Sequence, residues 1–185
     1  MFLKKSGGRM KKTINKIWNA VTTIILVILM LIAAVIFVPK FFGLEPLIVL
    51  SGSMEPTYPT GSLLYVKAIQ QEDVKEEVPI TFHLSDGTLV THRVIEVTAE
   101  GNFRTQGDAN EIADGGAVEY KNILGTPVAH IPKLGYLADK LSSTTGKIIY
   151  GSIVIAVIIL MLMGDYLFTP DKKEEKVEEK KDEDE

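Results

Sequence analysis

Two long apolar runs dominate the pattern of hydrophobic and polar positions along the 185-residue chain. The first, residues 17–38, holds 22 consecutive uncharged residues. At about 1.5 Å of rise per residue, a helix of that length spans roughly 33 Å, enough to cross the hydrocarbon core of a bilayer. The second run, residues 148–164, holds 17 uncharged residues, at the short end of the spanning range. The pattern predicts transmembrane helices over 17–38 and 148–168.

Each run also has a competing interpretation. The first resembles the apolar core of a secretory signal peptide, but such cores run only about 7–15 residues, so an uncleaved anchor is favoured. The second is short enough to be a helix buried in a soluble core, and we keep that alternative open.

The segment between the runs, residues 39–147, has short apolar stretches, turn residues and little 3.6-residue periodicity, which favours strands over helices. Asp86-Gly87 is a hairpin-turn signal, and Pro79 places its strand at an edge or stands at the strand's first residues. The expected strands are Leu47–Leu50, Ser62–Ala68, Val78–His83, Thr88–Val97, Phe103–Gln106 and Asn122–Ile131. The predicted fold is a membrane-anchored, mainly-β protein, with a small β-rich domain between two transmembrane helices.

Charge divides the chain into three parts. Residues 1–38 carry six Lys/Arg and no acid, residues 39–170 carry nine Lys/Arg and fifteen acids, and residues 171–185 carry five Lys and nine acids. The net negative middle part argues against nucleic-acid binding. The absence of cysteine excludes disulfides, thiol catalysis and cysteine-ligated zinc.

Lys and Arg close to membrane-spanning segments favour the cytoplasmic side. We therefore predict a cytoplasmic basic head (1–16), an extracytoplasmic domain (39–147) and a return of the chain to the cytoplasm through the second span. The acidic tail (169–185) has too few apolar residues to fold alone and is expected to be disordered.

Two short stretches carry a candidate nucleophile and a candidate base. Ser51-Gly-Ser53 follows an apolar strand, about fifteen residues beyond the first span. A serine hydroxyl needs a base to become a nucleophile. His92 shares a strand face with Val90 and Val94, and imidazole suits proton exchange at ambient pH. Taken alone, Ser53 would also be typical of an ordinary loop, and His92 of a half-buried strand.

A third stretch, Gln106–Asp114, holds three carboxylates within seven residues: Asp108, Glu111 and Asp114. Such a loop could bind a hard cation, orient the histidine of a catalytic triad, or form a solvated turn. His83 and His130 are weaker candidates for the base, because Pro79 makes the strand of His83 edge-like and no carboxylate cluster follows His130.

Taken together, these stretches resemble the type I signal peptidase family, in its histidine-type branch. That branch includes the catalytic subunit of the endoplasmic-reticulum signal peptidase complex and similar enzymes of archaea and endospore-forming bacteria. The resemblance covers about residues 17–165; the acidic tail is not a recognised family element. The matching pieces are Ser51-Gly-Ser-Met-Glu-Pro56, Thr60-Gly61, His92-Arg-Val94, Gly107-Asp-Ala-Asn110 with Asp114, and Gly125 to Gly135 with Ile131-Pro132.

The resemblance implies a membrane-bound serine endopeptidase that removes signal peptides from exported precursors at small-residue (A-x-A-like) sites. It implies Ser53 as nucleophile, His92 as general base and Asp114 as the carboxylate that holds the imidazole. Ser51 matches a position that stabilises the oxyanion, and Asp108 matches another acid of the same block. The expected partners are precursor proteins and the lipid bilayer, without metal, cofactor or nucleic acid. Further membrane subunits are not specified.

Two rival interpretations remain. One is a Ser-Lys protease that uses Lys67 as its base, although the family lysine position holds His92. The other is a non-catalytic, membrane-anchored β module that binds secreted proteins. Replacement of Ser53, His92 or Lys67 should affect precursor cleavage differently under each of these interpretations and under the favoured one.

Overall fold

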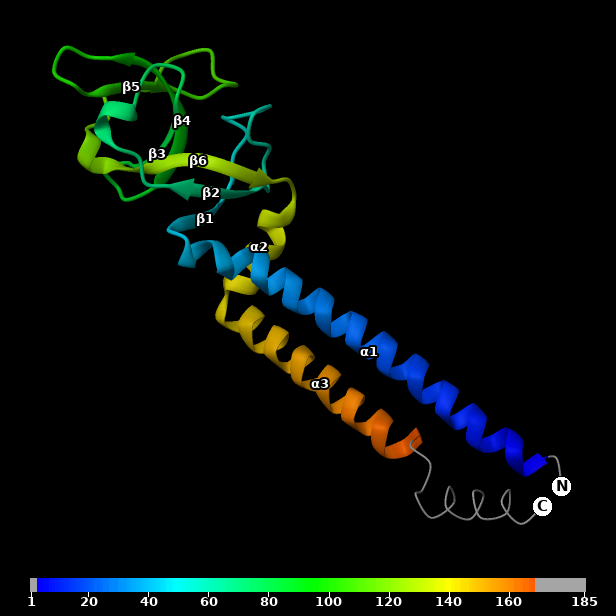
Figure 1. Ribbon diagram of the computed structural model, residues 1–185. Coiled ribbons are helices and arrows are strands. Elements are labelled where there is room, and N and C mark those ends of the chain that lie inside the picture. The colour runs from blue at the N-terminus through cyan, green and yellow to red at the C-terminus, as the bar shows by residue number, and fades with distance from the viewer. Residues whose placement is uncertain (1–2, 169–185) are drawn as a thin grey trace. The chain divides into compact units, whose positions relative to one another are not determined.

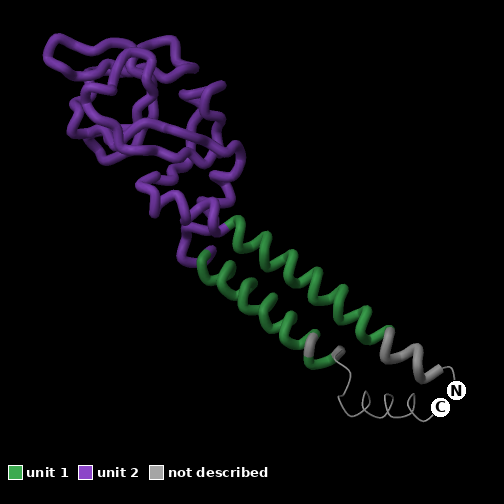
Figure 2. The backbone as a smooth tube through the Cα atoms, viewed as in Figure 1, with its two compact units in different colours: residues 1–32, 147–185 green, residues 33–146 purple. Residues whose placement is uncertain are grey.

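A computed structural model describes residues 3–168 (Figure 1). The predicted acidic tail, 169–185, lies outside the described residues. The chain divides into two compact units, 1–32 with 147–185 and 33–146 (Figure 2). The elements in chain order are α1 (Leu3–Phe41), β1 (Leu44–Ile48), β2 (Leu63–Lys67), η1 (Gln71–Asp73), β3 (Pro79–His83), β4 (Leu89–Val97), β5 (Phe103–Gln106), η2 (Tyr120–Asn122), β6 (Ile123–Ile131), α2 (Leu134–Ser142) and α3 (Thr144–Phe168).

The first unit contains most of α1 together with α3, and specific contacts join the two helices. The indole Nε1 of Trp18 donates a hydrogen bond of 2.8 Å to the carbonyl oxygen of Leu160, and the Tyr150 hydroxyl donates to the carbonyl of Leu29. A Cβ at Gly164 would lie 2.1 Å from Trp18 Cδ1, so only glycine leaves room for the indole there. The two helices of this unit therefore pair through defined residues.

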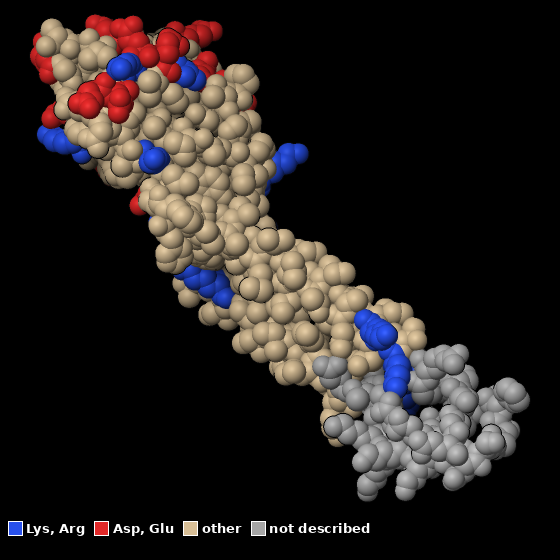
Figure 3. All heavy atoms as spheres, in the orientation of Figure 1, with Lys and Arg blue, Asp and Glu red and all other residues tan. Residues whose placement is uncertain are grey.

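Two segments of these helices are long and apolar enough to cross a membrane: Met10–Phe41 and Thr144–Gly164, with hydropathies of 3.2 and 2.3. Only 6% of the second window is buried, so the buried-core alternative for this run is wrong. In Figure 3 the acidic side chains on the visible face gather over the β-rich unit, while the described helical surface is mostly uncharged. The helices thus expose the apolar side chains that a bilayer would cover.

The second unit is built on one six-stranded antiparallel sheet with the order β1-β2-β6-β3-β4-β5. The β3–β4 hairpin turns at the predicted Asp86-Gly87 pair, where Asp86 Oδ1 accepts the Thr88 amide at 2.9 Å and Gly87 has φ +83°. Pairings between strands that are far apart in the sequence then place β6, the last strand of the domain, between β2 and β3. The predicted β-rich domain is confirmed.

The core of this unit lies on one face of β3, β4 and β5. Its buried members are Val74, Ile80, Phe82, Val94 and Phe103. Alternate residues of a strand face the same side, so His92 shares the core face with Val94. His92 is accordingly only 8% exposed. The period-2 pattern of β4 is what buries this histidine.

Three expectations about this unit need correction. The first strand is Leu44–Ile48 and not Leu47–Leu50, because its bounds are set by pairing with β2, from Leu44 opposite Lys67 to Ile48 opposite Leu63, and not by the apolar run alone. Pro46 is tolerated in β1 because this strand is at the edge of the sheet. β3 lies inside the sheet and Pro79 is its first residue, so the edge-strand argument against His83 is wrong. The elements expected for residues 39–147 also included no α-helix, and the structure has one.

The element missed there is α2, which packs against β1 and β2. Its apolar residues Leu134, Leu137, Ala138 and Leu141 have the i, i+3, i+4, i+7 spacing of an amphipathic helix. That signal was present in the sequence.

Candidate active site

Ser53 lies in the loop between β1 and β2, and the residues around it hold that loop. The Val49 amide donates to Ser62 O and the Gly61 amide donates to Val49 O, which closes the base of the loop. Met54 is 2% exposed and anchors the loop in the interior. Ser53 stands next to this anchor and remains partly exposed.

Glu55 braces the same loop from within. Its Oε1 accepts a hydrogen bond of 2.9 Å from the Thr60 hydroxyl and one of 3.3 Å from the Thr60 amide. The Glu55 amide in turn donates to Gly52 O at 3.0 Å. The residues on both sides of Ser53 are therefore tied into one turn.

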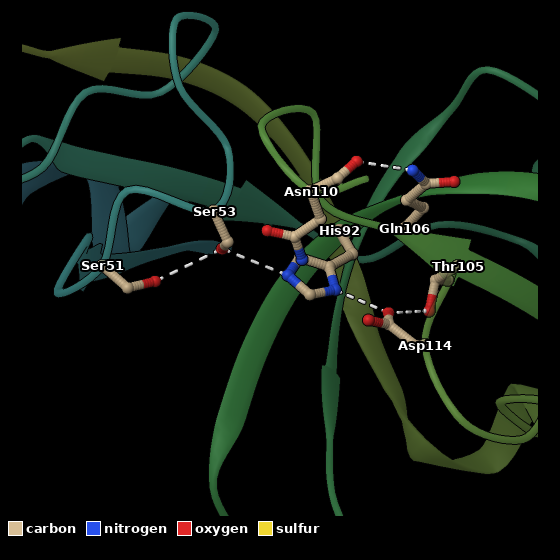
Figure 4. Close-up of polar contacts among 7 residues, drawn as sticks. All are labelled: Ser51, Ser53, His92, Thr105, Gln106, Asn110 and Asp114. Atoms are coloured by element: carbon tan, nitrogen blue, oxygen red, sulfur yellow. Dashed lines mark hydrogen bonds and ion pairs between the residues drawn. The ribbon is translucent and has the colours of Figure 1, made fainter. Parts of the chain in front are cut away.

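Ser53, His92 and Asp114 form a continuous chain of hydrogen-bonding contacts (Figure 4). The distance from Ser53 Oγ to His92 Nε2 is 3.1 Å, and His92 Nδ1 lies 2.6 Å from Asp114 Oδ2. A carboxylate only accepts hydrogen bonds, so this geometry places a proton on Nδ1 and leaves Nε2 of a neutral imidazole to accept from the serine. Such an arrangement can move a proton away from Ser53.

Two further hydroxyls complete the chain of contacts. The Thr105 hydroxyl donates to Asp114 Oδ2 at 2.6 Å, and the Asp114 amide donates to Thr105 O at 2.9 Å. At the other end, Ser51 Oγ and Ser53 Oγ are 3.3 Å apart. Thr105 thus holds the carboxylate in line with the imidazole, and Ser51 lies beside the serine oxygen.

Asp108 has different partners, although it belongs to the same loop as Asp114. Arg93 donates to it in a bidentate pair, from Nε to Oδ1 at 2.8 Å and from Nη2 to Oδ2 at 2.7 Å, and Thr57 also donates to Oδ2. Hydrogen bonding from Arg93 lowers the pKa of Asp108 below the usual aspartate range, although partial burial opposes the shift. The same pairing raises the pKa of Arg93.

The Asp108 loop packs directly on the Ser53 loop. The Ala109 amide donates to Ser53 O at 2.9 Å, and a Cβ at position 107 would lie 2.5 Å from that same oxygen. Gly107 is therefore required for the close approach of the two backbones. Gln106 Nε2 donates to Asn110 O at 2.6 Å and holds the start of the loop (Figure 4).

Of the sequence-predicted site residues, the structure brings Ser53, His92 and Asp114 together, with Ser51 adjacent and Asp108 in a separate ion pair. Within residues 3–168, the side-chain contacts of Ser53 Oγ are with Ser51 and His92, and Lys67 is not among them.

Sequence reasoning missed Thr105, Thr57 and the pairing of Arg93 with Asp108. The signal for Thr105 was its place two residues after the buried Phe103, on the same strand face.

The second unit is thus a β-sheet domain with a serine–histidine–aspartate chain of the kind that hydrolases use, in a chain with two apolar helices. Comparison with known proteins shows which enzymes the chain resembles. The chain is 45% identical over 91 residues to signal peptidase I W of Bacillus subtilis, covering 46% of this chain and 47% of that protein. The names of this and the following relatives support a type I signal peptidase of the branch shared by Bacillus and the endoplasmic reticulum.

Two eukaryotic signal peptidase subunits are also similar to the chain. The chain is 31% identical over 100 residues to the human signal peptidase complex catalytic subunit SEC11C, covering 48% of this chain and 52% of that protein. It is 35% identical over 108 residues to the SEC11 catalytic subunit of Pyricularia oryzae, covering 51% and 62%. The chain spans about half the length of the curated relatives it matches. No protein-family model matches it.

Proposed function

We propose that this protein is a membrane-bound serine endopeptidase that removes N-terminal signal peptides from exported proteins. The observation that carries the proposal is the Ser53–His92–Asp114 chain, at 3.1 and 2.6 Å, in a homologue of signal peptidases. Cleavage after small residues is part of the proposal, because signal-peptide cleavage sites carry small residues of the A-x-A type.

In the proposed reaction, Ser53 Oγ attacks the scissile carbonyl while His92 Nε2 takes the hydroxyl proton. Asp114 holds Nδ1 and stabilises the imidazolium that forms. His92 then gives the proton to the leaving amine, and the carbonyl carbon remains bound to Ser53 as an ester. A water molecule, deprotonated by the same imidazole, hydrolyses that ester and regenerates the serine.

The negative charge on the carbonyl oxygen needs hydrogen-bond donors in the transition state. The backbone N–H of Ser53 is the first donor in our proposal, because it belongs to the attacking residue. Ser51 is the second, and its support is the distance of 3.3 Å between the two serine hydroxyl oxygens. Both donors lie in the turn that Glu55 braces.

We further propose that both apolar helices cross the membrane, with both termini in the cytoplasm and the β-rich unit outside. The support is the Lys/Arg-rich head before the first apolar run, because positive residues near a span stay inside. Anchoring would confine the enzyme to the surface where signal peptides are held, which reduces the search for substrate.

The catalytic test replaces Ser53, His92 and Lys67 separately by alanine in membranes that contain no other signal peptidase, and follows precursor cleavage. We expect Ser53→Ala and His92→Ala to abolish cleavage and Lys67→Ala to leave it intact. Activity that survives His92→Ala but is lost with Lys67→Ala would support a Ser-Lys protease instead. Full cleavage by Ser53→Ala would support a non-catalytic binding module.

The topology test uses the absence of cysteine from the chain. Single cysteines are introduced at Glu100 in the β-rich unit and at Ser6 in the basic head, and intact cells are treated with a membrane-impermeant maleimide. We expect labelling of Glu100→Cys alone, with Ser6→Cys labelled only after lysis. The opposite pattern would reverse the proposed orientation.

A further inference from the structure

A cavity of about 500 Å³ lies beside His92 and Asp114 in the second unit. His92, Asp114 and Thr105 line one part of the cavity, and apolar side chains, including Phe82, Val90 and Val118, line another. The remaining polar lining residues are His83, Ser85 and Asn122. Ser53 is not among the lining residues. The cavity therefore adjoins the proton-transferring residues and not the nucleophile.

The position of the cavity relative to the imidazole matters for the reaction. Ser53 faces Nε2 of His92, and Asp114 faces Nδ1, on the other side of the ring (Figure 4). The acyl part of the substrate becomes bonded to Ser53. The leaving amine must lie close to Nε2 to receive a proton. The chain that follows the scissile bond therefore starts at the imidazole, and the imidazole is also a wall of the cavity.

We propose that this cavity, the leaving-group pocket, binds a side chain from the first two residues after the scissile bond, and selects precursors by that side chain. The proposal rests on the proposed peptidase function and deepens it. A pocket of a few hundred Å³ that combines apolar lining with a small number of polar groups is the usual form of a ligand site.

The chemistry of the lining specifies the side chain. Phe82, Val90 and Val118 favour an apolar group, since burial of apolar surface stabilises the bound substrate. The lining also holds the imidazoles of His83 and His92 beside the Asp114 carboxylate, and a charged side chain would lose hydration against the apolar part of the pocket. The pocket should therefore accept leucine or a similar apolar side chain and reject glutamate or aspartate.

Gly115 offers a way to fill the pocket without disturbing the rest of the domain. It lines the cavity, and a Cβ built at this position meets no atom within 4 Å. Gly116 also meets none, but its φ of +95° makes any side chain strained. Gly115→Leu is therefore the test variant. Glu111→Leu is the matched control, because it adds the same side chain to the same loop at an exposed residue outside the cavity lining.

The experiment measures kcat/KM of the full-length protein in detergent on precursors that differ only in the first or second residue after the cut, with leucine, alanine or glutamate there. For the wild type we expect leucine to exceed alanine by about tenfold at one of the two positions, as for one apolar group in a pocket, and glutamate to fall below alanine. In Gly115→Leu the ratio of leucine to alanine should fall to about one. In Glu111→Leu it should stay near tenfold.

Because the readout is a ratio of two kcat/KM values for one variant, a partial loss of folded protein lowers both values equally and leaves the ratio unchanged. Ser53-dependent cleavage without any leucine preference, or a preference that Gly115→Leu leaves intact, would overturn the pocket assignment alone. No cleavage of any precursor by the wild type would overturn the proposed function and the pocket assignment with it.

Discussion

His92 and Arg93 are neighbours on β4, yet they face opposite sides of the strand and bind two different aspartates of one loop. His92 points into the core side and contacts Asp114, with its side chain 10% exposed. Arg93 points the other way and forms a bidentate pair with Asp108. The loop of residues 107–114 thus reaches both faces of the strand.

The two clusters differ in what their geometry can do. In the first, Asp114 contacts a ring whose other nitrogen contacts Ser53, so a proton can move along the chain. In the second, Asp108 joins Arg93 to Thr57 of the Ser53 loop and cannot accept a proton from the serine. We expect the first cluster to control turnover and the second to control the position and stability of the loops. Each of the following tests compares one residue from each cluster.

The largest effect should come from the two residues of β4. His92→Gln should lower kcat on the order of 10⁴-fold or more, because the general base is lost. Arg93→Gln should lower kcat only by about tenfold and should increase hydrogen exchange at the Ala109 amide, which donates to Ser53 O. Single-turnover cleavage and amide exchange measure the two outcomes. An equal loss of turnover in both variants would contradict the assignment of turnover to the first cluster and of loop position to the second.

The two aspartates give the next comparison. Asp114→Asn keeps the size of the side chain but no longer stabilises a charged imidazole, so kcat should fall by about 10³–10⁴-fold. Asp108→Asn should cost about tenfold in kcat, with Ser53 still reactive. If Asp108→Asn were inactive while Asp114→Asn kept normal turnover, the roles of the two residues would have to be exchanged.

The dependence of stability on pH should distinguish Asp108. Its pKa is lowered by hydrogen bonding from Arg93, so the unfolded chain binds more protons at acid pH and stability rises with pH across that window. The contribution is complete above the unfolded pKa of about 3.9 and is lost as the pH falls through the lower folded value.

We expect Asp108→Asn to lower the free energy of unfolding by about 1.5–3 kcal/mol at pH 7, as for hydrogen bonds to charged groups. Its difference from the wild type should shrink as the pH falls below about 4. Urea unfolding of the full chain in detergent, monitored through amide exchange in β4 and β5, measures the difference in the free energy of unfolding between Asp108→Asn and the wild type. A difference that stays constant down to pH 2 would show that the ion pair contributes nothing.

The smallest effects should come from the two threonines. Thr105→Val keeps the shape of a residue that is 1% exposed but removes the hydrogen bond to Asp114, so kcat should fall by about tenfold with little change in KM. Thr57→Val removes a donor to Asp108 and should cost about 0.5–1.5 kcal/mol of stability with kcat nearly unchanged. A kcat effect of Thr57→Val larger than that of Thr105→Val would reverse the comparison.

Much of the fold followed from local patterns. Apolar length predicted the two helices, and Asp86-Gly87 predicted the hairpin of β3 and β4, which the structure confirms. The bounds of β1 were wrong because the apolar run Leu47–Leu50 was taken for the whole strand, and α2 was missed because its short apolar spacing was overlooked. These are failures to read a local signal that the sequence contains.

The sheet order was a different kind of unknown. β6 pairs with β2 and β3, which lie far from it in sequence, and no periodicity specifies such a pairing. The choice is made by the packing of the whole domain around Phe82, Val94 and Phe103. The same packing leaves the leaving-group pocket open beside His92.

By itself, the sequence determined which residues could carry the chemistry and which face of its strand His92 would occupy, because side chains alternate along any strand. It did not determine which aspartate meets which neighbour. Asp108 and Asp114 are six positions apart in one loop, and both are acids of similar reach. Only the path of the loop, set by the close approach of Gly107 to Ser53 and by the hydrogen bond from the Asp114 amide to Thr105, takes one carboxylate to the arginine and the other to the histidine.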